Sequence, residues 1–288
     1  MCIEFPEGKK FAICLTHDVD RVDKKWWHCI YYFVKTKKPY HLKSLFTKWR
    51  NNPYWNFEKI MTLENKYGVR STFFFLNETK KLELLNMKTY PIALGYYSIN
   101  DPRVVGVLKE LEQGGWEIGV HGSYDSYKNK ELLAKEKRTL EKILGKKIIG
   151  IRQHYLNLEI PATWKLQKDV GFKYDASFGY RRDIGFRDGK LLPFKPFEEE
   201  DFLVIPTTIM DSALFYKYSS PEMAWRKILE IFKHAEKNRA LITVLWHQRV
   251  FNEKEFPGWG KIYEKIIQEG LKRKAWFATC KEVWEVFR

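Results

Sequence analysis

One pattern of apolar and polar positions recurs along most of the chain. An amphipathic helical segment is followed by glycine and then by a short apolar run rich in β-branched and aromatic residues. Residues 57–67 have apolar positions at helical spacing, Gly68 follows them, and the run STFFFL comes next. Glycine after the last helical turn is the usual left-handed cap. The pattern therefore predicts helices that alternate with strands.

The same unit returns before several later apolar runs, and further runs stand near both ends of the chain. They read FAICLTHDVD, WEIGVHGS, IIGIRQHY, FKYDAS, LVIPTTI, LITVLWHQ and AWFATC. Continuous apolar runs, rather than alternating ones, are typical of buried parallel strands. We predict an α/β protein in which residues 1–288 form a single distorted (β/α) barrel of about seven strands. A doubly wound open sheet is the alternative, because sequence alone does not show closure.

Residues 21–55 interrupt this rhythm with a basic and aromatic segment that includes WWHCIYYFVKTKKPYHLKSLFTKW. Its apolar positions around Trp26, Ile30 and Val34 are spaced for one helical face. We predict an inserted helical hairpin that packs on the barrel. The alternative is an interfacial helix that contacts a membrane or a glycolipid, where Trp and Lys share the boundary.

The composition of the 288 residues, 44% hydrophobic and 16% aromatic, is ample for a sizeable core. The four cysteines lie far apart without a C-x-x-C pair, which favours neither a disulfide framework nor a cysteine zinc site and fits a reducing compartment. The N-terminal sequence lacks signal-peptide features, and no stretch has the length of a membrane span. We expect a cytoplasmic protein, with peripheral membrane contact as the alternative.

The formal net charge of +15 raises the question of a nucleic-acid partner. Lysines, however, alternate with glutamates along nearly all the predicted helices, which is typical of solvated faces, and no nucleic-acid motif is recognisable. We therefore predict no nucleic-acid partner. An acidic glycan or a membrane surface would explain the charge as well.

Ionisable side chains follow several of the predicted strands, where a barrel of this type carries its active site. Each alone has a structural explanation, since Asp after a strand commonly caps a helix and a lone His is usually hydrogen-bonded. Clustered buried charges need pairing or a metal. The residues are Asp18, Asp20, His121, Asp125, Arg152, His154, Asp175 and His247.

Carboxylate and imidazole groups together suit a divalent ion such as Zn²⁺, which needs about three protein ligands and an open position at a catalytic site. Asp20, His121 and Asp125 are the predicted ligands, because His121 and Asp125 share one face if the loop makes a helical turn. Asp18 points to the same side as Asp20 if the strand continues. One carboxylate can then hold the metal while the other takes a proton.

These segments resemble the motifs of the polysaccharide deacetylase family, carbohydrate esterases that share the NodB homology domain. The resemblance covers roughly residues 11–248 and is carried by THDVD, HGSYD, RQHY, YDASFGY and LWH. It implies a distorted (β/α) barrel that hydrolyses the acetamide of N-acetylglucosamine-type sugars.

The resemblance also implies a role for each motif. Asp18 is the general base and Asp20 binds metal. Arg152 orients the base, and Tyr155 donates a backbone N–H to the oxyanion. Asp175 supports His247, the general acid. The sequence departs from the family pattern where Asp125 replaces the usual second histidine and where His154 replaces a common proline.

We expect further contacts with a glycan substrate from Trp246, by stacking on a sugar ring, and from His154. Arg187, with Arg181 and Arg182 in the same loop, is a candidate for binding an acidic or phosphorylated glycan. Two other functions stay open. One is a non-catalytic glycan-binding protein on the same barrel, and the other is a deacylase of a small non-sugar amide.

Overall fold

The computed structural model describes residues 5–46, 51–80, 95–198, 201–218 and 220–288. Within these residues, nine strands form one parallel sheet in the order β6-β5-β4-β3-β2-β1-β8-β7, and β9 pairs with β1. The strands are β1 (Ala12–Val19), β2 (Thr72–Leu76), β3 (Glu117–Gly122), β4 (Gly150–Gln153), β5 (Tyr174–Asp175), β6 (Leu203–Val204), β7 (Ile209–Met210), β8 (Leu241–Leu245) and β9 (Trp276–Ala278).

The two edges of this sheet belong to one stretch of chain, residues 203–210. Its first part pairs with β5, where Ile205 N donates to Asp175 O at 2.8 Å. Its second part pairs with β8, where Thr208 N donates to Thr243 O at 2.9 Å. The single strand predicted from LVIPTTI is therefore bent into two short strands that join the edges of a curled sheet. The predicted distorted (β/α) barrel is confirmed.

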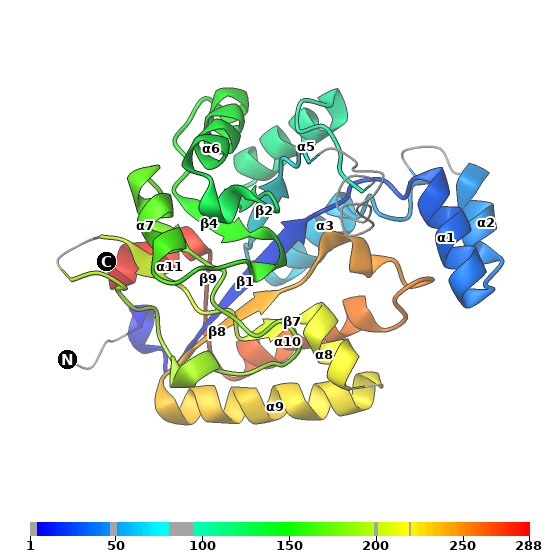
Figure 1. Ribbon diagram of the computed structural model, residues 1–288. Coiled ribbons are helices and arrows are strands. Elements are labelled where there is room, and N and C mark those ends of the chain that lie inside the picture. Colours follow the sequence, from blue (N-terminus) through cyan, green and yellow to red (C-terminus); the bar gives the residue numbers. More distant parts are fainter. Residues whose placement is uncertain (1–4, 47–50, 81–94, 199–200, 219) are drawn as a thin grey trace.

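Helices surround the strands in Figure 1, as the alternating pattern predicts. Gly68 and Gly145 cap α3 and α6 with φ of 65° and 67°, a left-handed conformation that glycine adopts without steric cost. The helices are α1 (Trp26–Thr36), α2 (Tyr40–Lys43), α3 (Phe57–Tyr67), α5 (Pro102–Gln113), α6 (Lys130–Leu144), α7 (Ala162–Asp169), α8 (Asp211–Lys217), α9 (Pro221–Asn238), α10 (Trp259–Lys272) and α11 (Cys280–Phe287).

Six short 3₁₀ helices stand at strand ends and in loops of the described chain. They are η1 (Pro6–Gly8), η2 (Ser44–Phe46), η5 (Ser126–Lys128), η6 (His154–Leu156), η7 (Arg187–Gly189) and η8 (Gln248–Phe251). Three of them, η5, η6 and η8, follow β3, β4 and β8 closely. They begin the loops at the carboxyl ends of these strands.

The core lies between the helices and the sheet, and β1 runs through its centre with all eight residues buried. On α3, Phe57 and Ile60 are fully buried, and each such side chain contributes about 1.5–3 kcal/mol of burial free energy. Because β1 has neighbours on both sides, its last residues, including Asp18, reach the carboxyl end of the sheet inside the protein.

The predicted helical insert is present as α1, α2 and η2, which lie to one side of the barrel in Figure 1. Residues 47–50 of the insert lie outside the described residues. Among the helices that the structure describes, none combines the length and the apolar character needed to cross a membrane.

Candidate active site

A cleft of about 290 Å³ opens at the carboxyl ends of β1, β3, β4 and β8. Its position agrees with the rule that barrel enzymes build their sites from the loops at this end of the strands. Its walls contain most of the ionisable residues expected from the sequence, together with arginines and aromatic side chains. Among the lining residues are Asp18, Asp20, Arg21, Tyr96, His121, His154, Tyr155, Arg181, His247 and Arg249.

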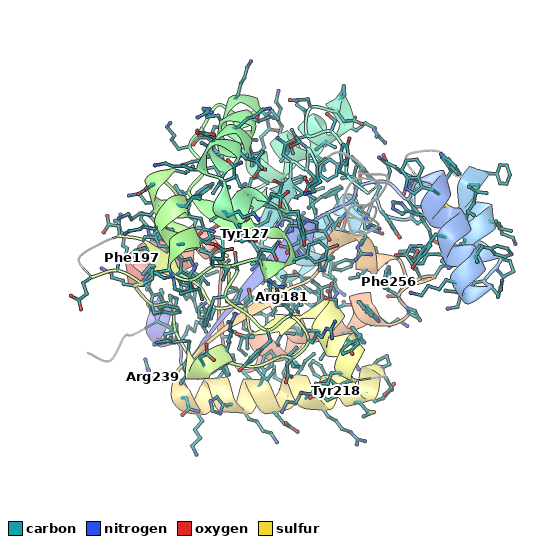
Figure 2. The ribbon with its side chains drawn as sticks, in the orientation of Figure 1. Tyr127, Arg181, Phe197, Tyr218, Arg239 and Phe256 are labelled. Carbon is teal, nitrogen blue, oxygen red and sulfur yellow. The ribbon has the colours of Figure 1, made fainter. Side chains whose placement is uncertain are left out.

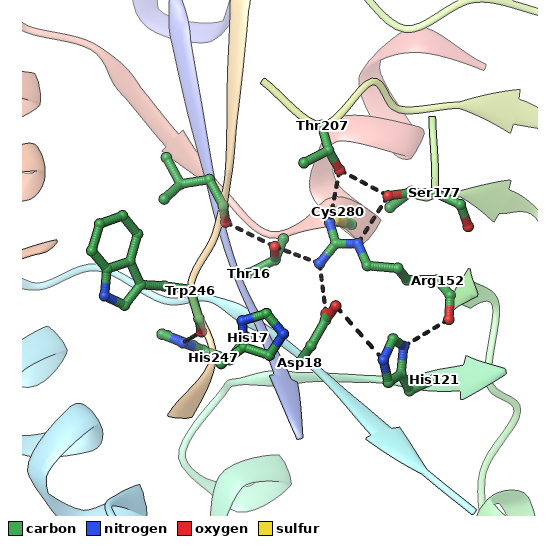
Figure 3. Close-up of polar contacts among 12 residues, drawn as sticks. Thr16, His17, Asp18, His121, Arg152, Ser177, Thr207, Trp246, His247 and Cys280 are labelled. Carbon is green, nitrogen blue, oxygen red and sulfur yellow. Dashed lines mark hydrogen bonds and ion pairs between the residues drawn. The ribbon is translucent and has the colours of Figure 1, made fainter. Parts of the chain in front are cut away.

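The Asp18 carboxylate is paired with a fully buried arginine, as Figure 3 shows. Arg152 Nη1 donates to Asp18 Oδ1 at 2.9 Å and to Thr16 Oγ1 at 2.7 Å. Arg152 Nε donates to the carbonyl oxygen of Ala176 at 2.8 Å, which fixes the guanidinium plane. The ion pair compensates the buried charge of Asp18 and holds the carboxylate at the floor of the cleft.

Asp20 and His121 form the centre of the cleft, with His121 Nε2 lying 3.2 Å from Asp20 Oδ1. His121 Nδ1 lies 2.9 Å from the carbonyl oxygen of Arg152, which can only accept a hydrogen bond. Nδ1 therefore carries a hydrogen, and in the neutral ring Nε2 presents its lone pair toward Asp20. This is the tautomer that a metal-binding histidine adopts.

His154 completes a group of three possible metal ligands with Asp20 and His121, whose ligand atoms all lie within 4.8 Å of one another. Burial lowers the pKa of His154 to about 4, so its ring is neutral and offers a lone pair. Asp20 Oδ1 and His154 Nδ1 are buried without a hydrogen-bond partner among the described residues. Two imidazoles and a carboxylate with unsatisfied buried atoms fit a divalent ion such as Zn²⁺.

Asp125, the ligand expected from the sequence, instead pairs with Lys80, whose Nζ lies 2.7 Å from its Oδ2. It stands at the start of η5 with its side chain 35% exposed. The structure therefore brings His154, expected to contact substrate, into the group where Asp125 was expected. The signal for His154 was available in the sequence, since a histidine directly after a buried strand is a ligand type in the right place.

His247 is held by a buried carboxylate that the sequence analysis did not single out. Its Nδ1 lies 2.8 Å from Asp211 Oδ1, and its backbone N–H donates to Asp211 Oδ2 at 2.7 Å. On the other side of the ring, Nε2 lies 3.4 Å from Asp20 Oδ2. Burial alone would lower the pKa of His247, but the charges of Asp211 and Asp20 raise it to about 9.

Asp211 is the first residue of α8, directly after β7, where an aspartate is easily interpreted as a helix-terminal residue. Asp175, expected in this role, sits in a separate network at the end of β5. Its carboxylate accepts hydrogen bonds from Ser177 Oγ at 2.6 Å and Gln167 Nε2 at 2.9 Å. Burial raises the pKa of Asp175. The structure thus pairs His247 with Asp211 and places Asp175 elsewhere.

Tyr155 lines the cleft, is 48% exposed, and has a left-handed backbone conformation with φ of 58°. Non-glycine residues in this conformation carry backbone strain and are frequent at functional sites. Leu156 shares the conformation with φ of 52°. The strained turn places the Tyr155 peptide at the cleft, where its oxyanion role remains a prediction.

Two residues expected to contact substrate have other surroundings. Trp246 is fully buried in the core and packs edge-on against Phe215, with ring centroids 6.1 Å apart. Arg187 packs its guanidinium on Phe178 at 4.3 Å and donates to Gly179 O at 3.2 Å. From the same loop it is Arg181 that lines the cleft, and Figure 2 shows it in front of the strands.

No protein-family model matches the sequence, and no curated protein matches it. Several solved structures, however, are similar to this chain. A putative polysaccharide deacetylase from Mycobacterium smegmatis is 16% identical, with a TM-score of 0.63 over 98% of this chain and 92% of that chain. A probable polysaccharide deacetylase from Pseudomonas aeruginosa PAO1 is 17% identical, with a TM-score of 0.65 over the same shares. The chain has the polysaccharide deacetylase fold.

Proteins with other printed descriptions share this fold. Puue allantoinase is 14% identical with a TM-score of 0.65 over 98% of this chain and 92% of that chain. A CE4 family pseudoenzyme from Bacillus anthracis is 12% identical with a TM-score of 0.52, over 97% of this chain and 66% of that chain. The polysaccharide deacetylase fold therefore supports more than one activity, and the function of this chain must be argued from its site.

Proposed function

We propose that the protein is a metal-dependent hydrolase that removes N-acetyl groups from a sugar or polysaccharide of the N-acetylglucosamine type. The observation that carries the proposal is the group Asp20, His121 and His154, which lies in one cleft with a buried carboxylate, Asp18, and a half-buried histidine, His247. The polysaccharide deacetylases among the structural neighbours support the same reaction class.

Asp20, His121 and His154 are the residues that would hold the metal, with Zn²⁺ as the ion that best suits one carboxylate and two imidazoles. Such an ion, when bound, polarises the acetyl carbonyl and lowers the pKa of water. In this assignment His154 takes the place first expected for Asp125.

Asp18 acts as the general base that removes a proton from the attacking water. Its Oδ2 lies 3.7 Å from His121 Nε2, so the carboxylate stands directly beside the ligand group. Arg152 is a positioning residue, because its bond to Asp18 Oδ1 leaves the other carboxylate oxygen toward the cleft. A base held in this way loses little entropy when it reacts.

His247 acts as the general acid that donates a proton to the leaving amine. The charges of Asp211 and Asp20 raise the pKa of His247 to about 9, and Asp211, which is not a proposed ligand, still favours the protonated ring when Asp20 holds the metal. The Asp211 carboxylate accepts from Nδ1–H, so the acidic Nε2–H faces the cleft. We assign to Asp211 the supporting role that the sequence suggested for Asp175. The Tyr155 backbone N–H is the proposed donor to the oxyanion.

The cleft wall favours a substrate that carries negative charge. Arg21, Arg181 and Arg249 all line it, and guanidinium groups bind carboxylates and phosphates well. An acidic or phosphorylated glycan therefore fits the wall better than a neutral one. We therefore assign the binding of an acidic glycan to Arg181, which lines the cleft, and not to Arg187.

The test is acetate release from chitooligosaccharides and from an acidic glycan, measured with the Zn²⁺-loaded protein and after chelation. Asp18→Asn should lower kcat by at least about 10³-fold, because it removes the base while the ligand group stays intact. Metal content should match the wild type, whereas thermal stability should fall, because the buried Arg152 guanidinium loses its counter-charge. Full activity of Asp18→Asn would contradict the mechanism.

The same assay separates the alternatives. Stoichiometric Zn²⁺ without any acetate release would indicate a glycan-binding protein. Turnover of small non-sugar amides in place of the oligosaccharides would indicate a different deacylase, and a panel of such amides belongs in the same experiment.

A further inference from the structure

The insert carries a cluster of exposed apolar side chains on its outer surface. On α1, Trp26, Ile30 and Val34 are spaced at i, i+4 and i+8 and are 61%, 44% and 58% exposed. Phe46 in η2 is 88% exposed. Large apolar side chains exposed on two short elements of one insert mark a surface that another apolar phase covers.

The inner side of the same hairpin is already tied to the barrel by polar contacts. Lys24 Nζ donates to Glu255 Oε2 at 2.6 Å and lies 2.7 Å from His41 Nδ1. Tyr54 OH donates to Glu255 Oε1 at 3.0 Å, and Asn252 Nδ2 donates to Tyr40 OH at 2.6 Å. The hairpin is therefore attached to the barrel by its inner side, and its exposed apolar residues do not belong to the barrel core.

Beyond Asp23, the charged side chains of the insert are all basic. Residues 24–57 contain no aspartate or glutamate. Four lysines of the same insert, Lys35, Lys37, Lys38 and Lys43, are all exposed. Lys35 Nζ lies 5.9 Å from the ring centroid of the exposed Tyr31, so basic and aromatic side chains share the surface.

Three kinds of partner could cover such a surface, and the observations favour one. A second copy joined through the same face would bring the lysines of both copies together without any acid to compensate them. A nucleic acid would find the lysines and the aromatic rings, but it offers nothing to Ile30 and Val34. An anionic bilayer takes aliphatic and aromatic side chains at its interface and binds lysines over its headgroups.

We infer that the insert docks the protein on an anionic lipid surface. Trp26, Ile30, Val34 and Phe46 enter the boundary between headgroups and acyl chains, and the four lysines lie over acidic headgroups. The long lysine side chains reach the headgroups while the apolar cluster is immersed.

Docking would bring the cleft close to the membrane, because the insert touches the cleft wall. Lys25, just before α1, donates from Nζ to the carbonyl oxygen of Tyr96 at 2.7 Å, and Tyr96 lines the cleft. If the proposed function holds, the sugar that is deacetylated would be presented at a lipid surface. The docking itself does not depend on that function.

The experiment is co-sedimentation of the full chain with vesicles of phosphatidylcholine alone and with vesicles that also contain phosphatidylglycerol. We expect binding to the mixed vesicles that weakens as salt is raised, and little binding to phosphatidylcholine alone. Equal binding to both vesicle types, or binding to neither, would overturn the inference.

Two matched pairs of variants locate the surface. Trp26→Ser with Val34→Ser should weaken vesicle binding by about 10-fold or more, whereas Tyr216→Ser, which alters a 72% exposed ring elsewhere, should leave it unchanged. Lys37→Glu with Lys38→Glu should weaken it by about 10-fold, and the equally charged Lys135→Glu with Lys142→Glu much less.

Circular dichroism and thermal unfolding identify any variant that fails to fold, and the lysine pair then tests the surface independently of the apolar pair. Sedimentation analysis and binding of single-stranded oligonucleotides complete the design. If the Trp26 and Val34 changes abolish a dimer, or oligonucleotide binding, without altering vesicle binding, the surface has that other partner. Vesicle binding does not use the cleft, so loss of deacetylase activity would leave this result intact.

Discussion

Two groups of histidine and acidic side chains lie near the end of β1, and their polar atoms differ in how fully they are hydrogen-bonded. The closed cluster consists of His17, Glu64, Trp116 and Tyr263. His17 Nδ1 lies 2.6 Å from Trp246 O, and Nε2 lies 3.0 Å from Glu64 Oε1. Tyr263 OH and Trp116 Nε1 donate to the two oxygens of Glu64, each at 2.7 Å.

The cleft cluster, Asp20 with His121 and His154, lies at the end of β1 on the face opposite to His17. Here Asp20 Oδ1 and His154 Nδ1 lack hydrogen-bond partners within the described chain, and both residues line the cleft. In THD, neighbouring side chains of β1 point to opposite faces, so His17 joins the helices and Asp18 joins the cleft. The comparison shows that satisfaction of polar atoms, and not residue type, separates a structural histidine from a functional one.

The largest effect should come from Asp20→Asn, which changes the cleft cluster at its centre. We expect loss of stoichiometric Zn²⁺ and a decrease of kcat by at least about 10³-fold, because the amide binds the ion weakly. Thermal stability of the metal-free protein should stay the same, since Asn is isosteric and the replaced charge lacks full compensation, whereas added Zn²⁺ should stabilise only the wild type. Metal analysis, acetate release and thermal unfolding measure the three quantities. If Asp20→Asn kept the wild-type metal content, the cleft cluster would not be a metal site, and the contrast with the closed cluster would be wrong.

Asp211→Asn should lower kcat by roughly 10²–10⁴-fold while leaving Zn²⁺ bound, because it weakens the support of the acid His247. Asp175→Asn is the matched comparison: it should affect the free energy of unfolding more than kcat, since its four hydrogen bonds join buried core residues. A larger loss of kcat from Asp175→Asn than from Asp211→Asn would restore the assignment made from the sequence.

Glu64→Gln should act in the opposite sense to Asp20→Asn. Removal of one carboxylate oxygen from the closed cluster should cost roughly 1–3 kcal/mol of unfolding free energy, because the Gln amide group would face one of the two donors that Glu64 now accepts. Zn²⁺ content and kcat should be unchanged. Glu110→Gln on the exposed face of α5 is the control and should leave stability unaltered. A loss of metal in Glu64→Gln with normal stability would show that the closed cluster is functional after all.

The smallest expected change in stability concerns Glu136, a carboxyl group that is hydrogen-bonded less completely than the closed cluster. Glu136 Oε2 accepts from Ser123 N at 3.3 Å, but Oε1 has no partner among the described residues. Burial raises the pKa of Glu136 to about 8. The folded protein therefore binds this proton more tightly than the unfolded chain does. Its contribution is fully present below the unfolded pKa of about 4.5 and is lost as pH rises toward 8.

Glu136→Gln imitates the protonated acid and should remove this pH dependence. Denaturant unfolding between about pH 5 and 8 should give a flatter profile, with the variant more stable by roughly 1–2 kcal/mol at the upper end. Parallel profiles for the wild type and the variant would mean that Glu136 is ionised in the folded protein.

Much of this arrangement could be predicted from the sequence because it depends on local rules. Glycine after a helix and an apolar run after glycine are local signals, and they give the barrel. Asp18, Arg152 and His247 directly follow or end buried strands, so their place at the mouth follows from strand direction alone.

The remainder depends on contacts between distant segments. Asp125 and His154 are both near strand ends, and only the loop conformations decide that Asp125 meets Lys80 while His154 turns toward Asp20. Asp211 joins His247 because residues 203–210 bend from one strand neighbour to another. The burial of Trp246 follows from strand alternation, since Leu245 and His247 line the cleft and the residue between them faces the core.

The bent stretch at residues 203–210 has a consequence for how the protein can evolve. Near its middle, Thr207 Oγ1 lies 3.3 Å from Arg152 Nη2, and just beyond its end stands Asp211. One piece of backbone thus sets the position of both the partner of the base and the partner of the acid. Insertions or deletions in this stretch would misalign both proton transfers together, whereas the hydrogen bonds of α1 and α2 in the described chain involve neither Arg152 nor Asp211. We therefore expect related proteins to differ in the length of the insert more often than in the length of residues 203–210.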